Sequence, residues 1–125
     1  MILTKEVEKK DFYREYYRAI NGLLNLTNRE IDVLSEFSYI KNSLPDSYTE
    51  SQKDEYLFSS TTRGIISEKL GISTFNLNNS IKSLRDKGVF IKSDKKTYTI
   101  NKFLFTRVNT EDVEFKLLFK IKQHV

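Results

Sequence analysis

One glycine separates two short amphipathic segments of this chain, and that arrangement constrains the fold more than any other feature. The stretch has the sequence SSTTRGIISEKLGISTFNLNNSIKSLRDKG. Either Ser59 or Ser60 can cap a helix, which is expected to end at about Leu70. Gly71 then supplies the backbone freedom for a sharp turn. Residues 59–71 therefore predict a short helix that stops abruptly.

A second helix is expected immediately after the turn. Ser73 is a favourable N-cap, and Gly88 is suited to end the helix after Lys87. Apolar residues recur at helical spacing, which gives each helix one inward side. The expected inward residues are Ile66, Leu70, Ile72, Leu77, Ile81 and Leu84. Two short helices joined by a glycine turn form a helix-turn-helix.

The segment after Gly88 changes from helical spacing to β-branched and aromatic residues. Val89–Lys92 predicts one strand and Thr97–Ile100 predicts its partner. The polar connection Ser93–Lys96 has the length of a hairpin loop. A small, basic hairpin is therefore expected to follow the second helix.

The rest of the chain predicts further helices and a terminal strand. Asp11–Leu24 carries aromatic and aliphatic residues at helical spacing. Thr27 and Glu30 fit a capping box that opens another amphipathic helix. The polar stretch Asn42–Glu55 holds the only proline and predicts a loop. Residues 113–122 alternate and then shift phase, which predicts one strand with a bulge or two short strands. The predicted fold class is α+β, mainly helical.

Positive charge is concentrated in the region of the predicted helix pair and hairpin. The whole chain has a net charge of +4, whereas Ser59 to Arg107 holds ten basic and three acidic residues, a net charge of +7. A basic segment inside a mildly acidic chain indicates either a surface that faces a polyanion or a solvated, lysine-rich face.

Composition excludes several classes of function. With no cysteine and one histidine, His124, the chain offers no disulfide framework, zinc finger or cysteine nucleophile, and no enzyme activity, metal or cofactor is expected. The acidic residues Glu111, Asp112 and Glu114 are expected in a solvated turn. No apolar run approaches the roughly 20 residues of a membrane span. The first residues mix acids and bases without a signal-peptide pattern, so a cytoplasmic location is expected.

The run from residue 65 to residue 101 resembles winged helix-turn-helix DNA-binding proteins. The family pattern is Ile, a small residue, two polar residues and Leu-Gly, matched here by ISEKLG, in which Ser67 replaces the usual alanine. The family also has apolar residues six, ten and thirteen positions after that glycine, and here these are Leu77, Ile81 and Leu84. Gly88 closes the recognition helix before the basic wing.

The ending YTIN is similar to the wing end of plasmid replication-initiator winged helices and of MarR-like regulators, although Lys102 stands where initiators often have proline. The layout also looks like small phage proteins. The resemblance covers about Asn25 to Phe105. It implies a winged helix-turn-helix domain over 25–107, an N-terminal helical extension over 1–24 and a C-terminal strand extension over 108–125.

The resemblance implies that the second helix of the pair enters the major groove of DNA with its N-terminal residues at the base edges. The expected outward residues are Thr74, Phe75, Asn76, Asn78, Asn79, Lys82 and Arg85. Asparagine can bind adenine bidentately, so the three amides favour A·T-containing sites, unless they form only a solvated face. Phe75 is expected to touch a thymine methyl or to pack on the preceding helix. Lys82 and Arg85 are expected to bind phosphate.

Other basic residues are expected at the DNA backbone. Lys92, Lys95 and Lys96 would place cations of the wing over the minor groove or the phosphates. Arg63 lies near a helix N-terminus, where family members often meet backbone phosphates.

The resemblance implies sequence-specific binding of double-stranded DNA by a transcriptional regulator. One alternative is a plasmid or phage replication initiator with the same module. Another is a phage structural or assembly protein that uses the winged helix to dock on virion proteins, which would place it in the virion. The stripe of Phe12, Tyr13, Tyr16 and Tyr17 is expected either in the core or at a homodimer surface, and a homodimer would bind a palindromic site.

Overall fold

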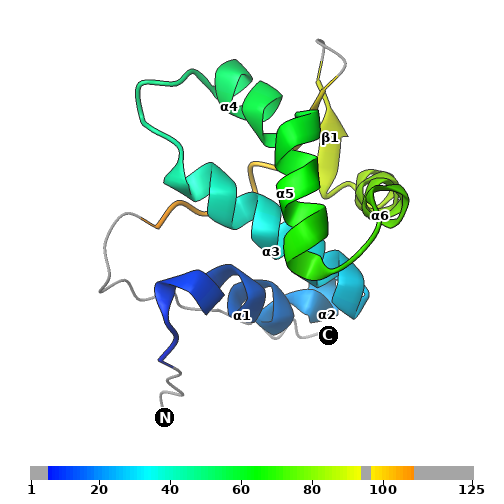
Figure 1. The fold of residues 1–125 in the computed structure, drawn as a ribbon. Coiled ribbons are helices and arrows are strands. Elements are labelled where there is room, and N and C mark those ends of the chain that lie inside the picture. The colour runs from blue at the N-terminus through cyan, green and yellow to red at the C-terminus, as the bar shows by residue number, and fades with distance from the viewer. Residues whose placement is uncertain (1–5, 94–96, 109–125) are drawn as a thin grey trace, which may run out of the picture.

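The computed structural model describes residues 6–93 and 97–108, and it is mainly helical with a small two-stranded antiparallel sheet (Figure 1). This confirms the predicted α+β class. After a 3₁₀ turn, Lys9–Asp11, the elements are α1 Phe12–Ala19, α2 Asn21–Leu24, α3 Asn28–Ser43, α4 Glu50–Leu57, α5 Ser60–Leu70, α6 Thr74–Asp86, β1 Phe90–Lys92 and β2 Tyr98–Ile100. Helix α3 contacts α1, α4, α5 and α6, so it forms the centre of the fold.

The predicted N-terminal helix is interrupted, which corrects the sequence interpretation. Helix α1 ends at Ala19, and the short α2 follows before Asn25 turns left-handed with φ of 55°. The side chain of Asn21 donates to the carbonyl of Leu26 and accepts from its N–H, at 3.0 and 2.7 Å. Asparagine that bonds nearby backbone in this way favours a helix end over its interior. Leu23 consequently lies outside the apolar stripe, with 80% of its surface exposed.

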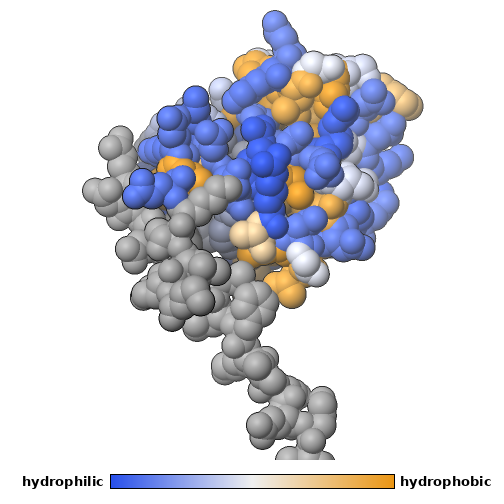
Figure 2. Space-filling view, turned by 90° about the horizontal axis from the view of Figure 1, so that it is seen from below, coloured by the Kyte–Doolittle hydropathy of each residue, from blue (hydrophilic) through white to orange (hydrophobic). Residues whose placement is uncertain are grey.

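The aromatic stripe of α1 packs largely within its own chain. Tyr13 and Tyr17 are buried, while Phe12 and Tyr16 are partly buried against the same cluster. The hydroxyls of Tyr13 and Tyr17 bond the carbonyl of Thr106 and the hydroxyl of Ser38. Seen from the α1 side, the coloured atoms show separate hydrophobic patches among hydrophilic ones (Figure 2).

The predicted pair of short helices is confirmed as α5 and α6. Ser59 accepts a hydrogen bond from the N–H of Thr62, and Ser73 accepts one from the N–H of Asn76, so both serines are N-caps. Gly71 and Gly88 have φ of 66° and 77°, the region that glycine enters without a Cβ penalty. The two helix ends therefore fall where the glycines place them.

A serine closes the turn between α5 and α6. The hydroxyl of Ser67 donates to the carbonyl of Ile72 at 2.5 Å, and the N–H of Ile72 donates to the carbonyl of Ser67 at 3.0 Å. The Ser67 hydroxyl thus satisfies the carbonyl of Ile72. An alanine at position 67 could not donate this hydrogen bond.

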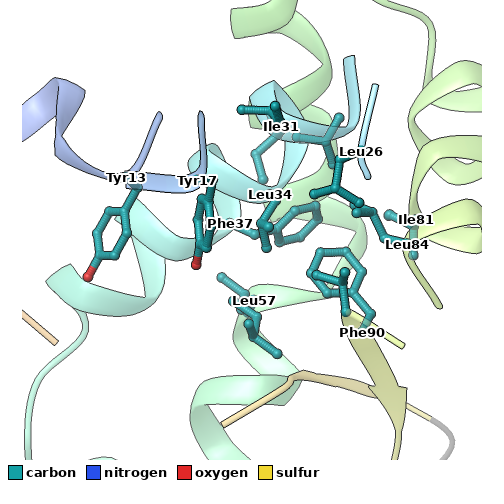
Figure 3. Close-up of a cluster of buried hydrophobic side chains, with 14 of the residues drawn as sticks. Tyr13, Tyr17, Leu26, Ile31, Leu34, Phe37, Leu57, Ile81, Leu84 and Phe90 are labelled. Carbon is teal, nitrogen blue, oxygen red and sulfur yellow. The ribbon is translucent and has the colours of Figure 1, made fainter. Parts of the chain in front are cut away.

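The hydrophobic core lies between α3, α5, α6 and the hairpin. Phe37 of α3 stacks on Phe58, with ring centroids 4.8 Å apart. It also meets Phe90 of β1 edge-on at 5.4 Å, and Figure 3 labels these two residues within the buried cluster. The predicted inward residues Ile66, Leu77, Ile81 and Leu84 are buried, and Leu70 and Ile72 are half-buried. The face of α6 that turns inward is therefore the predicted one.

The segment predicted as a loop, Asn42–Glu55, contains helical structure at both ends. Helix α3 continues to Ser43, and α4 begins at Glu50. A second capping box, between Thr49 and Gln52, starts α4 with hydrogen bonds of 2.9 and 3.1 Å. The loop prediction was wrong here because most residues of α4 are polar, so the segment does not show the apolar periodicity from which a helix is predicted.

The hairpin follows α6 directly and confirms the predicted strand pair. Phe90 pairs with Ile100 and Lys92 with Tyr98, and each strand begins one residue later than predicted. Asn101 fastens its base, because its side chain donates to the carbonyl of Gly88 at 3.1 Å and its N–H donates to the carbonyl of Val89 at 2.8 Å.

Some predictions fall on residues that the structure does not describe. The C-terminal strand and the acidic residues Glu111, Asp112 and Glu114 lie within 109–125, and Lys95 and Lys96 lie within 94–96. Among the residues that the structure does describe, no helix is long and apolar enough to cross a membrane.

Candidate nucleic-acid interface

The outward face of α6 presents the side chains that the sequence predicts there. Leu77, Ile81 and Leu84 turn inward and are buried, which leaves the opposite face to solvent. Phe75 is 72% exposed, so most of its ring faces solvent. The other exposed residues of this face are Thr74, Asn76, Asn78, Asn79 and Lys82. The first turn of α6 contains no acidic residue, so nothing there opposes the attraction of a helix N-terminus for anions.

Arg63 joins α5 to this face of α6. Its Nη1 donates to Oδ1 of Asn78 at 3.0 Å, and its Nε is buried without a hydrogen-bond partner among the described residues. The amide of Asn78 is thereby oriented, with its oxygen towards Arg63 and its two N–H donors available. Arg63 is half-buried beside α6. It therefore orients the Asn78 side chain as well as placing a cation near the surface.

Ion pairs neutralise part of the basic region. Lys69 lies 2.8 Å from Glu36, Lys87 lies 2.7 Å from Glu30, and Arg107 pairs with Asp46. These acids all precede Ser59, so the net charge of the 59–107 stretch overstates the charge that its surface presents.

The remaining cations near α6 differ in their partners. Arg85 is half-buried and lies 3.1 Å from the carboxylate of Asp86. The hydrogen bond to Asp86, followed by one to Tyr98, raises the pKa of the Arg85 guanidinium. Lys82 and Lys92 are exposed and have no acidic partner among the described residues. They are the better placed of these cations for phosphate contacts.

Glu30 holds α6 against α3. Its buried carboxylate accepts hydrogen bonds from the Ser83 hydroxyl at 2.6 Å, the Lys87 ammonium at 2.7 Å and the Thr27 N–H at 2.8 Å. Burial alone would raise the pKa of this carboxyl, but the hydrogen bonds from Lys87, Ser83 and Thr27 outweigh it and lower the pKa to about 2. The carboxylate therefore stays ionised and fixes the C-terminal half of α6.

The sequence reading found only part of this arrangement. It identified Glu30 as the second member of a capping box, but that pattern concerns contacts three residues apart and gives no sign of Ser83 or Lys87.

Scans against protein-family models, curated proteins and solved structures each find no match for the chain.

Proposed function

We propose that residues 25–107 form a winged helix-turn-helix that binds double-stranded DNA sequence-specifically, as a transcriptional regulator in the bacterial or phage-infected cytoplasm. The observation that carries this proposal is the exposed face of α6, where three amides and Phe75 precede Lys82 and no acidic residue occupies the first turn. Such a face fits the major groove, whose base edges offer hydrogen-bond donors, acceptors and thymine methyls.

The amides have different proposed roles. Asn76 and Asn79 are proposed to bind adenine through both the amide oxygen and the amide nitrogen. Asn78 already accepts a hydrogen bond from Arg63, so it is proposed to donate to an acceptor such as guanine O6 or thymine O4. Lys82 and Lys92 are proposed to bind phosphates, which position the protein without specifying sequence.

The test is fluorescence anisotropy with the full chain and two duplexes, one from upstream of its own coding region and one of shuffled sequence. Asn79→Ala should bring the two affinities closer together. Lys82→Ala should weaken both alike and reduce the slope of log affinity against log salt by about one.

A matched lysine variant controls for the change of net charge. Lys10 lies in the 3₁₀ turn before α1, its side chain is 70% exposed, and α1 and α6 lie on different sides of α5 in Figure 1. Lys10→Ala should leave the salt slope unchanged. Equal effects of Lys82→Ala and Lys10→Ala, or no binding of any duplex at low salt, would refute the proposal.

One observation favours a second candidate, a protein-docking role of the kind that a phage assembly protein needs. Phe75 exposes a large apolar ring at the start of the same helix, and exposed aromatic residues are common anchors of protein interfaces. Salt-insensitive behaviour towards all duplexes, together with loss of a virion-protein complex in Phe75→Ala, would favour docking. A replication initiator would use the same DNA contacts at an origin.

Homodimer formation through the N-terminal aromatic helix stays a prediction. Since Tyr13 and Tyr17 are buried in their own chain, a partner could contact only the exposed parts of Phe12 and Tyr16. Sedimentation of the chain with a palindromic duplex distinguishes one bound copy from two.

A further inference from the structure

A cavity of about 600 Å³ lies between α4, the hairpin and the segment 101–107. Its size falls within the range of small-molecule sites, roughly 300–1,000 Å³. Apolar and cationic side chains share its wall. The residues that matter here are Lys41, Lys53, Ile91, Thr99, Phe103 and Phe105.

Two of these side chains are lysines that are almost fully buried. The side chains of Lys41 and Lys53 are 9% and 8% exposed. Both ammonium groups lie 3.5 Å from the same carboxylate, that of Glu50, which is itself 73% exposed. These distances exceed the roughly 2.7–2.9 Å of a charge-assisted hydrogen bond, so one solvated carboxylate is shared loosely between two desolvated cations.

The surrounding charges favour an anion. Lys102 also lines the cavity, as does Arg107, which is already paired with Asp46, and Glu50 is the one acid among the lining residues in the described part of the chain. Asp54, which follows Lys53 in α4, is buried and has one carboxyl oxygen without a hydrogen-bond partner among the described residues. Burial raises the pKa of Asp54, opposed by the nearby Lys41 cation and by a hydrogen bond with Thr99, so Asp54 is a second carboxyl close to Lys41.

The cavity wall also has an apolar part, which a ligand would have to cover with an apolar group of its own. Phe103 is 82% exposed and Ile91 is 46% exposed, although both line a concave surface. The ammonium of Lys41 also lies 4.8 Å from the centre of the Phe105 ring. A ligand with an apolar body would cover these side chains while its charged group reached the two lysines.

We propose that this cavity binds a small organic anion, with a carboxylate or phosphate group between Lys41 and Lys53 and an apolar body against Ile91, Phe103 and Phe105. Charge complementarity selects the anion, and the exposed aromatic and aliphatic surface selects the apolar body. Neither feature belongs to the DNA-facing side of α6.

The position of the cavity couples it to α6. Strand β2 contacts α4, whereas β1 contacts α6, and Asn101 bonds the hairpin to the end of α6. In Figure 1, α4 and α6 lie on opposite sides of β1. A ligand between α4 and the hairpin would therefore shift the wing relative to α6 and change DNA affinity, an effect that rests on the proposed function.

The binding site itself is tested without DNA. Amide signals of the full chain are followed by NMR during titration with octanoate, octanamide and acetate. Octanoate should shift the signals of Lys53 and residues 99–105, and the neutral amide and the short acid should bind at least about tenfold more weakly. Octanamide that binds as tightly as octanoate, or octanoate that shifts none of these signals at millimolar concentration, would overturn the proposal.

Variants assign the effect to the cavity. Lys53→Met should weaken octanoate binding about tenfold, which is the loss of one charge-assisted contact. Lys82→Met on α6 is the matched control and should bind octanoate as the original chain does. Phe103→Ala alters a mostly exposed residue, so it preserves the fold, and it should weaken octanoate several-fold. Octanoate affinity that is unchanged in both cavity variants would also overturn the proposal.

DNA enters only in a last step. If octanoate binds in the cavity but leaves duplex affinity unchanged, the regulatory effect is refuted while the binding site stands. If no duplex binds at all, the proposed function fails, and the NMR titration still decides whether the cavity takes an organic anion.

Discussion

Replacing Glu30 by glutamine should reveal how strongly α6 is held to α3. The pKa of this carboxyl falls from 4.5 to about 2 in the folded chain. Since one pKa unit corresponds to about 1.36 kcal/mol, the ionised carboxylate stabilises the fold by about 3 kcal/mol. Glutamine keeps the shape but removes the charge and replaces one accepting oxygen with an NH2 donor, so Glu30→Gln should lower the free energy of unfolding at pH 7 by about 2–3 kcal/mol.

The pH dependence gives the sharper test. A carboxyl whose pKa is lower in the folded state stabilises the fold above its unfolded pKa of 4.5, and this contribution is lost as the pH falls towards about 2. Urea unfolding should therefore show a difference between the original chain and Glu30→Gln that is constant near neutral pH and disappears towards pH 2.

Glu68→Gln, an exposed carboxylate on α5, controls for the loss of one negative charge and should cost well under about 1 kcal/mol. A stability difference for Glu30→Gln that does not change with pH, or that equals the Glu68→Gln difference, would refute the reasoning.

Three further changes test local features by thermal or urea unfolding. Gly71→Ala should destabilise by about 1 kcal/mol because φ is positive there, whereas Gly64→Ala inside α5 should stabilise by up to about 1 kcal/mol; equal signs would contradict this. Ser67→Ala should cost about 1 kcal/mol, and no cost would mean that the turn does not need the hydroxyl. Asn42→Ala removes both hydrogen bonds to the backbone of Val108 and should cost about 1–2 kcal/mol, unlike an exposed-site alanine.

The α5–α6 pair could be predicted because its signals are local. Ser59 and Ser73 cap helices through contacts within one turn, and Gly71 and Gly88 end them through their own backbone freedom. The spacing of Leu77, Ile81 and Leu84 then fixes which face of α6 turns inward, and hence which amides face solvent. Fold class and the outward face of the candidate site were available from such patterns.

Features that depend on distant or buried polar residues could not be predicted in this way. Helix α4 buries Lys53 and Asp54, residues that hydropathy assigns to the surface. Its capping box of Thr49 and Gln52 is a local signal that the loop prediction did not use. The hydrogen bond that Lys87 donates to Glu30 spans 57 positions, and no local pattern connects these two residues. The cavity beside α4 was missed for the same reason.

The ion pair between Glu36 and Lys69 limits what can replace a residue that looks replaceable. The Lys69 side chain is 57% exposed, yet it lies 2.8 Å from a carboxylate that is only 9% exposed, and the other cation at that carboxylate, Arg14, is 3.9 Å away. Exposed lysines usually vary freely in evolution because little depends on them. Position 69 is different, since a neutral residue there would strand a negative charge in the interior. In natural variants of this chain, substitutions at positions 36 and 69 should consequently occur together.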